Sequence, residues 1–132
     1  MKKALKIFGF AAALVVFAAI AGFLLIQNQA RSAMAALSYG QVSMADAQDG
    51  VYEGEADAGL VAVRVKVAVK GGAIESIELL KHDNGMGRKA ESILGEMERA
   101  DTWDVDAVSG ATLSSETIKS AVSLALNKSA SN

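Results

Sequence analysis

The feature that most constrains the fold is a strict alternation between residues 61 and 70. Valine occupies every odd position from Val61 to Val69, whereas the even positions carry alanine, arginine or lysine. Successive side chains of a β-strand point to opposite faces, so this period of two predicts a strand with one buried and one solvated face. Such a strand needs neighbouring strands and an apolar layer against its valine face.

Glycines directly after this strand predict a hairpin. Gly71 and Gly72 suit a two-residue turn with positive φ angles, so the returning strand over residues 73–80 is expected to pair antiparallel. Ile74 is out of phase with the apolar residues that follow it, which predicts a β-bulge near Glu75.

A further strand is predicted before the valine strand. Residues 51–56 lie between two turn signals, Asp49-Gly50 and Asp57-Ala58-Gly59. Gly54 within this strand predicts either a bulge or the close approach of another group.

Two helices are predicted after the strands. The first covers residues 88–100, where apolar residues form one stripe. The second begins near Ser114 or Ser115, because serine is a good N-cap and apolar residues recur at helical spacing from Ile118 to Ala125. The predicted fold class is therefore α+β, a small antiparallel sheet with two helices packed on its valine face.

An uncharged apolar segment precedes this domain. Residues 7–26, at a rise of about 1.5 Å each, span a hydrocarbon core of about 30 Å. Lys2, Lys3 and Lys6 precede the segment, and only Arg31 follows closely. The positive-inside rule therefore predicts a single-pass helix in the cytoplasmic membrane, with the N-terminus in the cytoplasm and the C-terminal domain on the extracytoplasmic (periplasmic) side.

A cleaved signal peptide is the alternative for this segment, since residues 32–35 include small residues that suit a cleavage site. The apolar region exceeds the usual signal-peptide core of about 7–15 residues, which favours an uncleaved anchor. The predicted organisation is a basic cytoplasmic N-terminus (1–6), a transmembrane anchor (7–26) in contact with lipid, a tether (27–49) and a domain (50–132).

Composition excludes several kinds of chemistry. The chain has no cysteine, which excludes disulfides, thiolate metal sites and a cysteine nucleophile, so redox activity requires a bound cofactor. A formal net charge of −2 gives no reason to expect nucleic acid as a partner. Asp101, Asp104 and Asp106 alternate, but the glycine and glutamate of a calcium loop are missing at its sixth and twelfth positions, and no metal site is predicted.

Residues 106–112 read DAVSGAT and place a hydroxyl just before the second predicted helix. Free N–H groups at a helix N-terminus attract anions, and Gly110 and Ala111 let a bulky ligand approach the main chain. This pattern predicts a phosphate-binding turn that ends at Thr112. An ordinary small-residue turn that caps the helix is the alternative.

The same residues resemble the D-x-x-S/T-G-A-T signature of the FMN-binding domain family, found in flavin subunits of sodium-pumping NADH:quinone reductases and Rnf-type complexes. In that family a flavin transferase joins FMN through its phosphate to the last threonine. The resemblance extends over about residues 50–126 and implies a covalent phosphoester between FMN and Thr112. The residues that it implies for recognition by the transferase are Asp106, Ser109, Gly110, Ala111 and Thr112.

The resemblance also implies residues around the flavin. Leu113 and Ser114 follow the attachment residue directly. Gly85, Met86 and Gly87 resemble the small-residue loop on which the isoalloxazine ring lies in the family.

Two single aromatic residues have open interpretations. His82, the only histidine, is expected at the start of the loop after the third strand, where it either hydrogen-bonds the flavin or lies on the surface. Trp103, the only tryptophan, either stacks on an aromatic ligand or covers the edge of the core.

The resemblance implies an electron-transfer flavoprotein rather than a free-standing enzyme. Its expected partners are FMN, a flavin transferase, membrane lipid and redox proteins. The alternatives are a module that binds FMN noncovalently and a structural subunit of a membrane redox complex.

Overall fold

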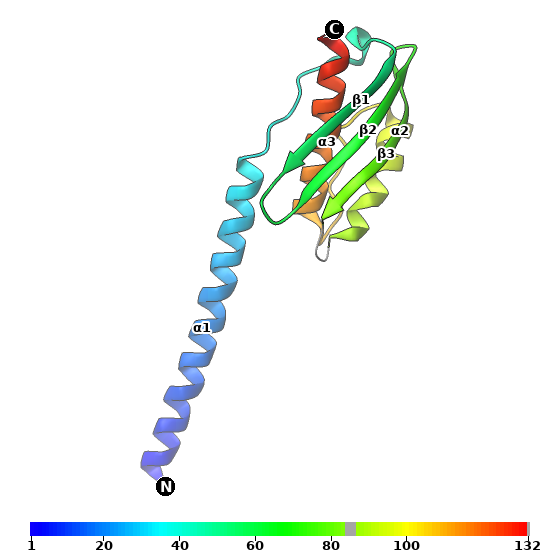
Figure 1. The fold of residues 1–132 in the computed structure, drawn as a ribbon. Helices are drawn as coiled ribbons and strands as arrows, with labels where there is room; N and C mark the ends of the chain where they lie inside the picture. Colours follow the sequence, from blue (N-terminus) through cyan, green and yellow to red (C-terminus); the bar gives the residue numbers. More distant parts are fainter. Residues whose placement is uncertain (84–86, 132) are drawn as a thin grey trace. The chain divides into compact units, whose positions relative to one another are not determined.

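The computed structural model describes residues 1–83 and 87–131, and the chain forms two units, Met1–Ser32 and Ala33–Asn132. The elements in chain order are α1 (Lys2–Ala35), the 3₁₀-helix η1 (Met44–Asp46), β1 (Gly50–Asp57), β2 (Ala62–Lys70), β3 (Ala73–Asp83), the 3₁₀-helix η2 (Arg88–Ser92), α2 (Ile93–Ala100) and α3 (Thr112–Ala130) (Figure 1).

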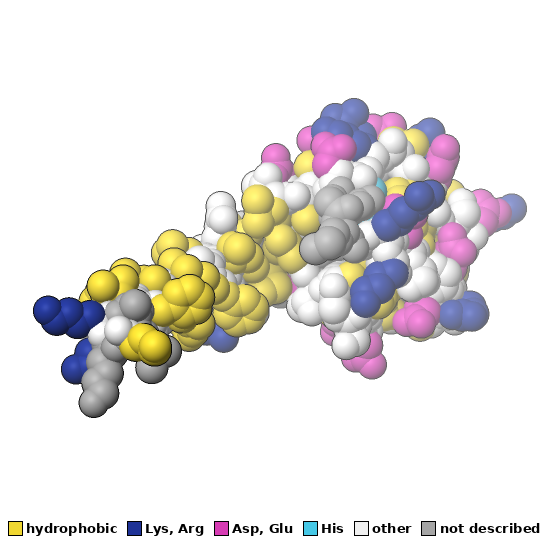
Figure 2. Space-filling view, turned by 90° about the horizontal axis from the view of Figure 1, so that it is seen from below, with side chains coloured by type: hydrophobic (Ala, Val, Ile, Leu, Met, Phe, Trp, Pro, Cys, Tyr) yellow, Lys and Arg dark blue, Asp and Glu magenta, His cyan; other side chains and the backbone are white. Residues whose placement is uncertain are grey.

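α1 is a long apolar helix at the N-terminus. Figure 2 shows hydrophobic side chains over the visible surface of this helix and basic side chains at its N-terminal end. The stretch Lys6–Ala35 is long and apolar enough to cross a membrane. This helix is therefore a membrane anchor or a signal sequence.

The three strands form one antiparallel sheet in the order β1-β2-β3. The valines of β2 are buried, and Val65 and Val67 are fully enclosed. Gly71 and Gly72 join β2 to β3 with φ angles of +62° and +75°, as predicted for a two-residue hairpin. The α+β fold class is confirmed.

Two register shifts divide β3, which is three residues longer than the predicted strand. The shift opposite Ala68 and Val69 leaves Glu75 without a partner on β2, so the predicted bulge is confirmed. A second shift, not predicted, leaves Leu80 unpaired. The bulges keep four side chains of β3 paired with the valines of β2: Ile74 with Val69, Ile77 with Val67, Leu79 with Val65, and His82 with Val63.

The helices cover the valine face of the sheet, as predicted. α3 lies against β1 and β2, and α2 lies against β3 (Figure 1). The predicted helix over residues 88–100 is α-helical only from Ile93, because residues 88–92 form η2. α2 also covers the free edge of β3, since Glu98 and Asp101 accept hydrogen bonds of 2.7 Å from the backbone N–H groups of Ile77 and Ile74.

β1 lies directly on the backbone of α3 at Gly54. A Cβ at this position would overlap the carbonyl oxygen of Ala121 and lie 2.8 Å from the Ala125 nitrogen. Of the two interpretations of this glycine, the close approach of another group is therefore correct.

The segment that follows α1 packs on another face of α3. Gly40 N donates to Ser123 Oγ at 3.0 Å, and Ser120 Oγ donates to the carbonyl of Ser38. A Cβ on Gly40 would overlap the carbonyl oxygen of Ser123. The apolar side chains of this segment that pack against the core are Leu37, Val42, Met44 and Ala47. Much of the segment predicted as a tether thus contacts the core.

Candidate functional site

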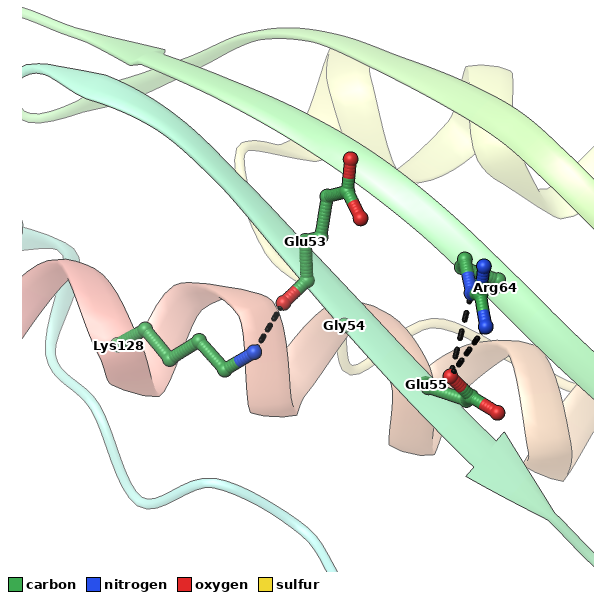
Figure 3. Close-up of a pocket in the computed structure, with 5 residues that line it drawn as sticks. All are labelled: Glu53, Gly54, Glu55, Arg64 and Lys128. Carbon is green, nitrogen blue, oxygen red and sulfur yellow. Dashed lines mark hydrogen bonds and ion pairs between the residues drawn. The ribbon is translucent and has the colours of Figure 1, made fainter.

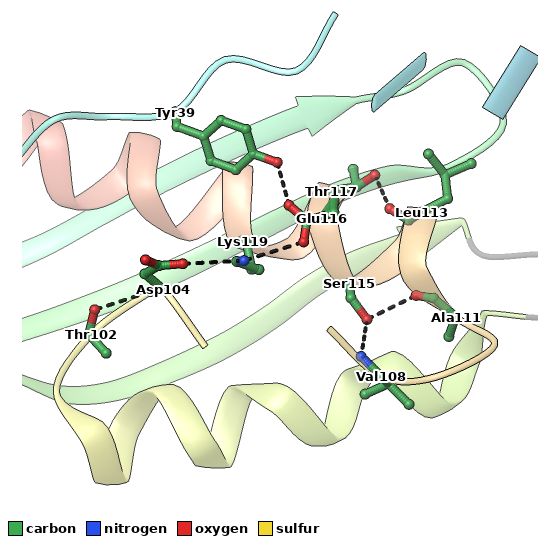
Figure 4. A network of polar contacts seen from close by, with 10 residues as sticks. All are labelled: Tyr39, Thr102, Asp104, Val108, Ala111, Leu113, Ser115, Glu116, Thr117 and Lys119. Carbon is green, nitrogen blue, oxygen red and sulfur yellow. Dashed lines mark hydrogen bonds and ion pairs between the residues drawn. The ribbon is translucent and has the colours of Figure 1, made fainter. Parts of the chain in front are cut away.

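The residues of the predicted phosphate-binding turn form a β-turn from Val108 to Ala111. Ala111 N donates to the Val108 carbonyl at 2.9 Å, and Gly110 at the third position has a φ of +77°. A positive φ there is typical of a type II turn, which explains the glycine. Ser115 fixes the turn: its Oγ accepts from Val108 N and donates to the Ala111 carbonyl, both at 2.9 Å (Figure 4).

The helix after this turn begins at Thr112, so its predicted start at Ser114 or Ser115 is wrong. Ser115 N already donates to the carbonyl of Ala111, the N-cap residue. The side chains of Ser114 and Ser115 are buried, and the Ser115 hydroxyl bonds back to the main chain four residues earlier instead of capping N–H groups. Thr112 is therefore the first helical residue and not part of the preceding turn.

Thr112 is exposed at this helix start, whereas Ala111 is buried and Leu113 packs against the core. Ala111 has no side chain that accepts hydrogen bonds, and the first turn of α3 contains no acidic residue. The first N–H groups of the helix thus lack a side-chain cap. An anion on Thr112 would meet both these donors and the positive end of the helix dipole.

Lys89 is a residue of this site that the sequence analysis did not identify. It is exposed on η2, and its Nζ lies 2.8 Å from the position that a Cβ on Gly110 would occupy. η2 also packs against α3. The sequence offered a weak signal in the basic pair at positions 88 and 89, but no spacing rule relates residue 89 to residue 110.

The His82 side chain is buried, so its surface interpretation is wrong. His82 lies in β3 and not in the following loop. The bulge at Leu80 places it on the same face of the sheet as Val63. Its side chain is 2% exposed, and Nδ1 lies 2.9 Å from Glu91 Oε1 on η2. This contact ties the end of β3 to the helix that carries Lys89. A role for His82 toward the flavin stays a prediction.

The predicted glycine loop is only partly described. Gly85 and Met86 lie outside the described residues. Gly87 precedes η2 as its N-cap residue and is partly buried. In Figure 1 the C-terminal end of β3 lies at the same end of the domain as the N-terminal ends of η2 and α3.

Trp103 covers the edge of the core. Its ring stacks on Tyr39 with centroids 5.4 Å apart and an interplanar angle of 25°. The Tyr39 hydroxyl donates to Glu116 Oε2 at 2.7 Å (Figure 4). Burial, followed by the hydrogen bond to Glu116, raises the pKa of Tyr39 above its ordinary value.

Carboxylates near the turn are partly compensated by lysine. Lys119 Nζ lies 3.4 Å from Asp104 Oδ1 and 3.3 Å from Glu116 Oε1 (Figure 4). Asp106 and Ser109 are exposed at the start of the turn. Within residues 1–83 and 87–131, no group of three or more His, Asp or Glu side chains is arranged to hold a metal ion.

A surface hollow elsewhere on the domain offers less to an anion. It is lined by Glu53, Gly54, Glu55, Arg64 and Lys128 (Figure 3). Both of its cations already have protein partners: Arg64 Nε and Nη2 donate to Glu55 Oε2 at 3.1 and 2.9 Å, and Lys128 Nζ donates to the Glu53 carbonyl at 2.6 Å.

The turn at the start of α3 fits a phosphoryl group. It combines an exposed hydroxyl on Thr112, uncapped helix N–H groups, the absence of a side chain at Gly110 and the ammonium group of Lys89. These are donors and positive charges, which are the groups that a phosphate ester requires.

The sequence model of a family described as the FMN-binding domain matches residues 59–127. The match covers more than half of the 132 residues and includes β2, β3, η2, α2, the turn before α3 and most of α3. No curated protein has a significant match to this chain.

Proposed function

We propose that this chain, which belongs to the FMN-binding domain family, carries FMN covalently on Thr112 and transfers electrons. The observation that supports this proposal most is the position of Thr112. It is an exposed hydroxyl residue at the uncapped start of α3, at the end of the DAVSGAT signature.

The proposed attachment forms one phosphoester bond. Thr112 Oγ1 bonds to the phosphorus of FMN, and the hydroxyl proton passes to the leaving phosphate group. The donor is a phosphoanhydride of FMN, whose bond between phosphorus and the leaving phosphate oxygen breaks. A flavin transferase catalyses this exchange. The chain gains the mass of one FMN less one water.

The protein's own groups hold the phosphoryl end. The N–H groups at the start of α3 donate to the phosphate oxygens, and the helix dipole favours its negative charge. Gly110 leaves room beside the ester. The isoalloxazine ring of bound FMN supplies the redox chemistry. Because the bond is covalent, the small domain retains FMN even where the free cofactor is scarce.

We further propose that the domain works outside the cytoplasm. Lys2, Lys3 and Lys6 precede the apolar part of α1, and only Arg31 follows it within the helix. This asymmetry favours a cytoplasmic N-terminus. An uncleaved α1 then anchors an electron carrier on the outer face of the cytoplasmic membrane, between redox partner proteins.

Intact mass measured after denaturation tests the attachment. The full chain is produced together with a flavin transferase, alongside Thr112→Ala and the control Ser114→Ala, which removes the neighbouring hydroxyl. We expect the FMN-less-water gain in the wild type and in Ser114→Ala, and none in Thr112→Ala. A wild type without this gain would contradict the proposal. Flavin that is released on unfolding would instead support noncovalent binding.

A further inference from the structure

The ammonium group of Lys89 lies above Gly110, two residues before the proposed attachment residue. Its Nζ is 2.8 Å and its Cε 3.5 Å from the position of a Cβ at Gly110. Consecutive Cα atoms are about 3.8 Å apart, so the Cα atoms of Gly110 and Thr112 are at most about 7.6 Å apart. The flexible lysine stem can therefore bring its charge to a group on Thr112.

The charge of Lys89 is not used by the protein in the described part of the chain. No carboxylate in residues 1–83 and 87–131 forms an ion pair with it. The acidic groups nearest to it in the sequence have other partners: Glu91 Oε1 lies 2.9 Å from His82 Nδ1, and Asp83 Oδ2 lies 3.0 Å from Lys81 Nζ. An exposed ammonium over a glycine turn is thus available to an anion.

The anion that this position suits is a phosphodiester. An FMN joined through its phosphate to Thr112 keeps one negative charge at neutral pH, and the first turn of α3 supplies N–H donors but no full positive charge. Lys89 comes from a different element, η2, and supplies the missing cation. Because Gly110 has no side chain, the ammonium group can come close to the main chain of the turn.

We infer that Lys89 binds the phosphodiester on Thr112 and fixes its position against the start of α3. This inference rests on the proposed attachment of FMN to Thr112. Lys89 is a binding residue for the phosphoryl group, and its salt-sensitive contact contributes to the stability of the loaded protein. Because its side chain is exposed, we expect Lys89→Ala to change the stability of the unloaded chain little.

The test compares loaded and unloaded full-length protein. Wild type, Lys89→Ala, Lys89→Arg and the control Lys70→Ala are purified with and without FMN, and loading is verified by intact mass. Lys70 is an exposed lysine at the hairpin between β2 and β3. The hairpin lies at the opposite end of the sheet from the C-terminal end of β3. The two readouts are the melting temperature at low and high ionic strength and the ³¹P resonance of the loaded protein.

We expect loading to raise the melting temperature of the wild type by about 3 °C more than that of Lys89→Ala at low ionic strength. This difference should shrink at high ionic strength, and Lys89→Arg and Lys70→Ala should behave like the wild type. The ³¹P resonance should shift in Lys89→Ala alone. Unloaded Lys89→Ala should melt with the unloaded wild type.

Equal effects of loading in the wild type and Lys89→Ala, with an unchanged ³¹P resonance, would overturn the role of Lys89 and leave the attachment intact. A wild type that gains no FMN in the presence of the transferase would overturn both proposals. The two failures are therefore distinguished by the mass of the wild type.

Discussion

Glycines that lie beside the middle of α3 and glycine in the turn before its start have opposite roles. In the middle, Gly54 from β1 and Gly40 from the preceding segment bring main chain against main chain, and a Cβ at either position would overlap a backbone carbonyl. At the start, the space beside Gly110 is met only by the flexible end of Lys89 among its nearest neighbours. Backbone atoms therefore closely cover the middle of α3, whereas a flexible charged side chain borders the turn at its start.

This difference separates the scaffold from the site on one helix. The side chains from Ser114 to Ser129 are mostly buried. This part of α3 packs against the sheet and against the segment that follows α1. Thr112, in the same helix, is exposed. A ligand on Thr112 would therefore be held by a well-packed helix without disturbing the core.

Substitution of Gly54 should have the largest effect on this comparison. In Gly54→Ala the new Cβ overlaps the Ala121 carbonyl, so β1 must move away from α3. We expect a loss of about 3 kcal/mol in the free energy of unfolding. The fluorescence of Trp103 during denaturant unfolding of the unloaded chain measures it. Gly95→Ala is the control, because its Cβ meets nothing within 4 Å and should stabilise α2 by up to about 1 kcal/mol.

Substitution of Gly110 should lower the free energy of unfolding less than substitution of Gly54, but it should slow the attachment of FMN. Its φ of +77° makes Gly110→Ala unfavourable by about 1–2 kcal/mol, and the new Cβ displaces the Lys89 ammonium. We expect slower attachment of FMN, measured as the time course of the mass gain with the transferase. Gly59→Ala has a similar backbone cost at φ +76° with nothing within 4 Å, and should be loaded at the wild-type rate. Equal loading of the two variants would mean that the open space at Gly110 is not needed.

The smallest expected effect concerns the contact between Tyr39 and Glu116. Because the pKa of Tyr39 is raised in the folded chain, the stability that depends on its protonated form is complete below about pH 10, the unfolded pKa, and is lost as the pH rises above it. We expect a loss of about 0.5 kcal/mol by pH 10.5, because solvent screens this partly exposed pair. Denaturant unfolding between pH 9 and 10.5 measures it. Tyr39→Phe should lack this dependence, and Tyr52→Phe should retain it.

Local patterns predicted the sheet well. Alternating valines, a double glycine and one out-of-phase isoleucine are short-range signals, and the strands, the hairpin and the bulge at Glu75 follow from them. A role for Thr112 in FMN attachment was predicted only through resemblance to a family signature. Its role stays a prediction, because the family match concerns the domain and not the bond.

The features that were missed depend on contacts distant in the sequence. The bulge at Leu80, which buries His82, has no turn residue to mark it. The start of α3 was placed too late because serine is a common N-cap, whereas here Ser115 bonds back to the main chain. Lys89 belongs to the site only because η2 packs against α3 and brings residue 89 over residue 110.

The segment after α1 belongs to the folded domain almost from its first residue. Only Ala36 separates the last residue of α1 from Leu37, which already contacts the core. Removal of residues 37–47 would therefore strip side chains from the folded domain and would not merely shorten a linker.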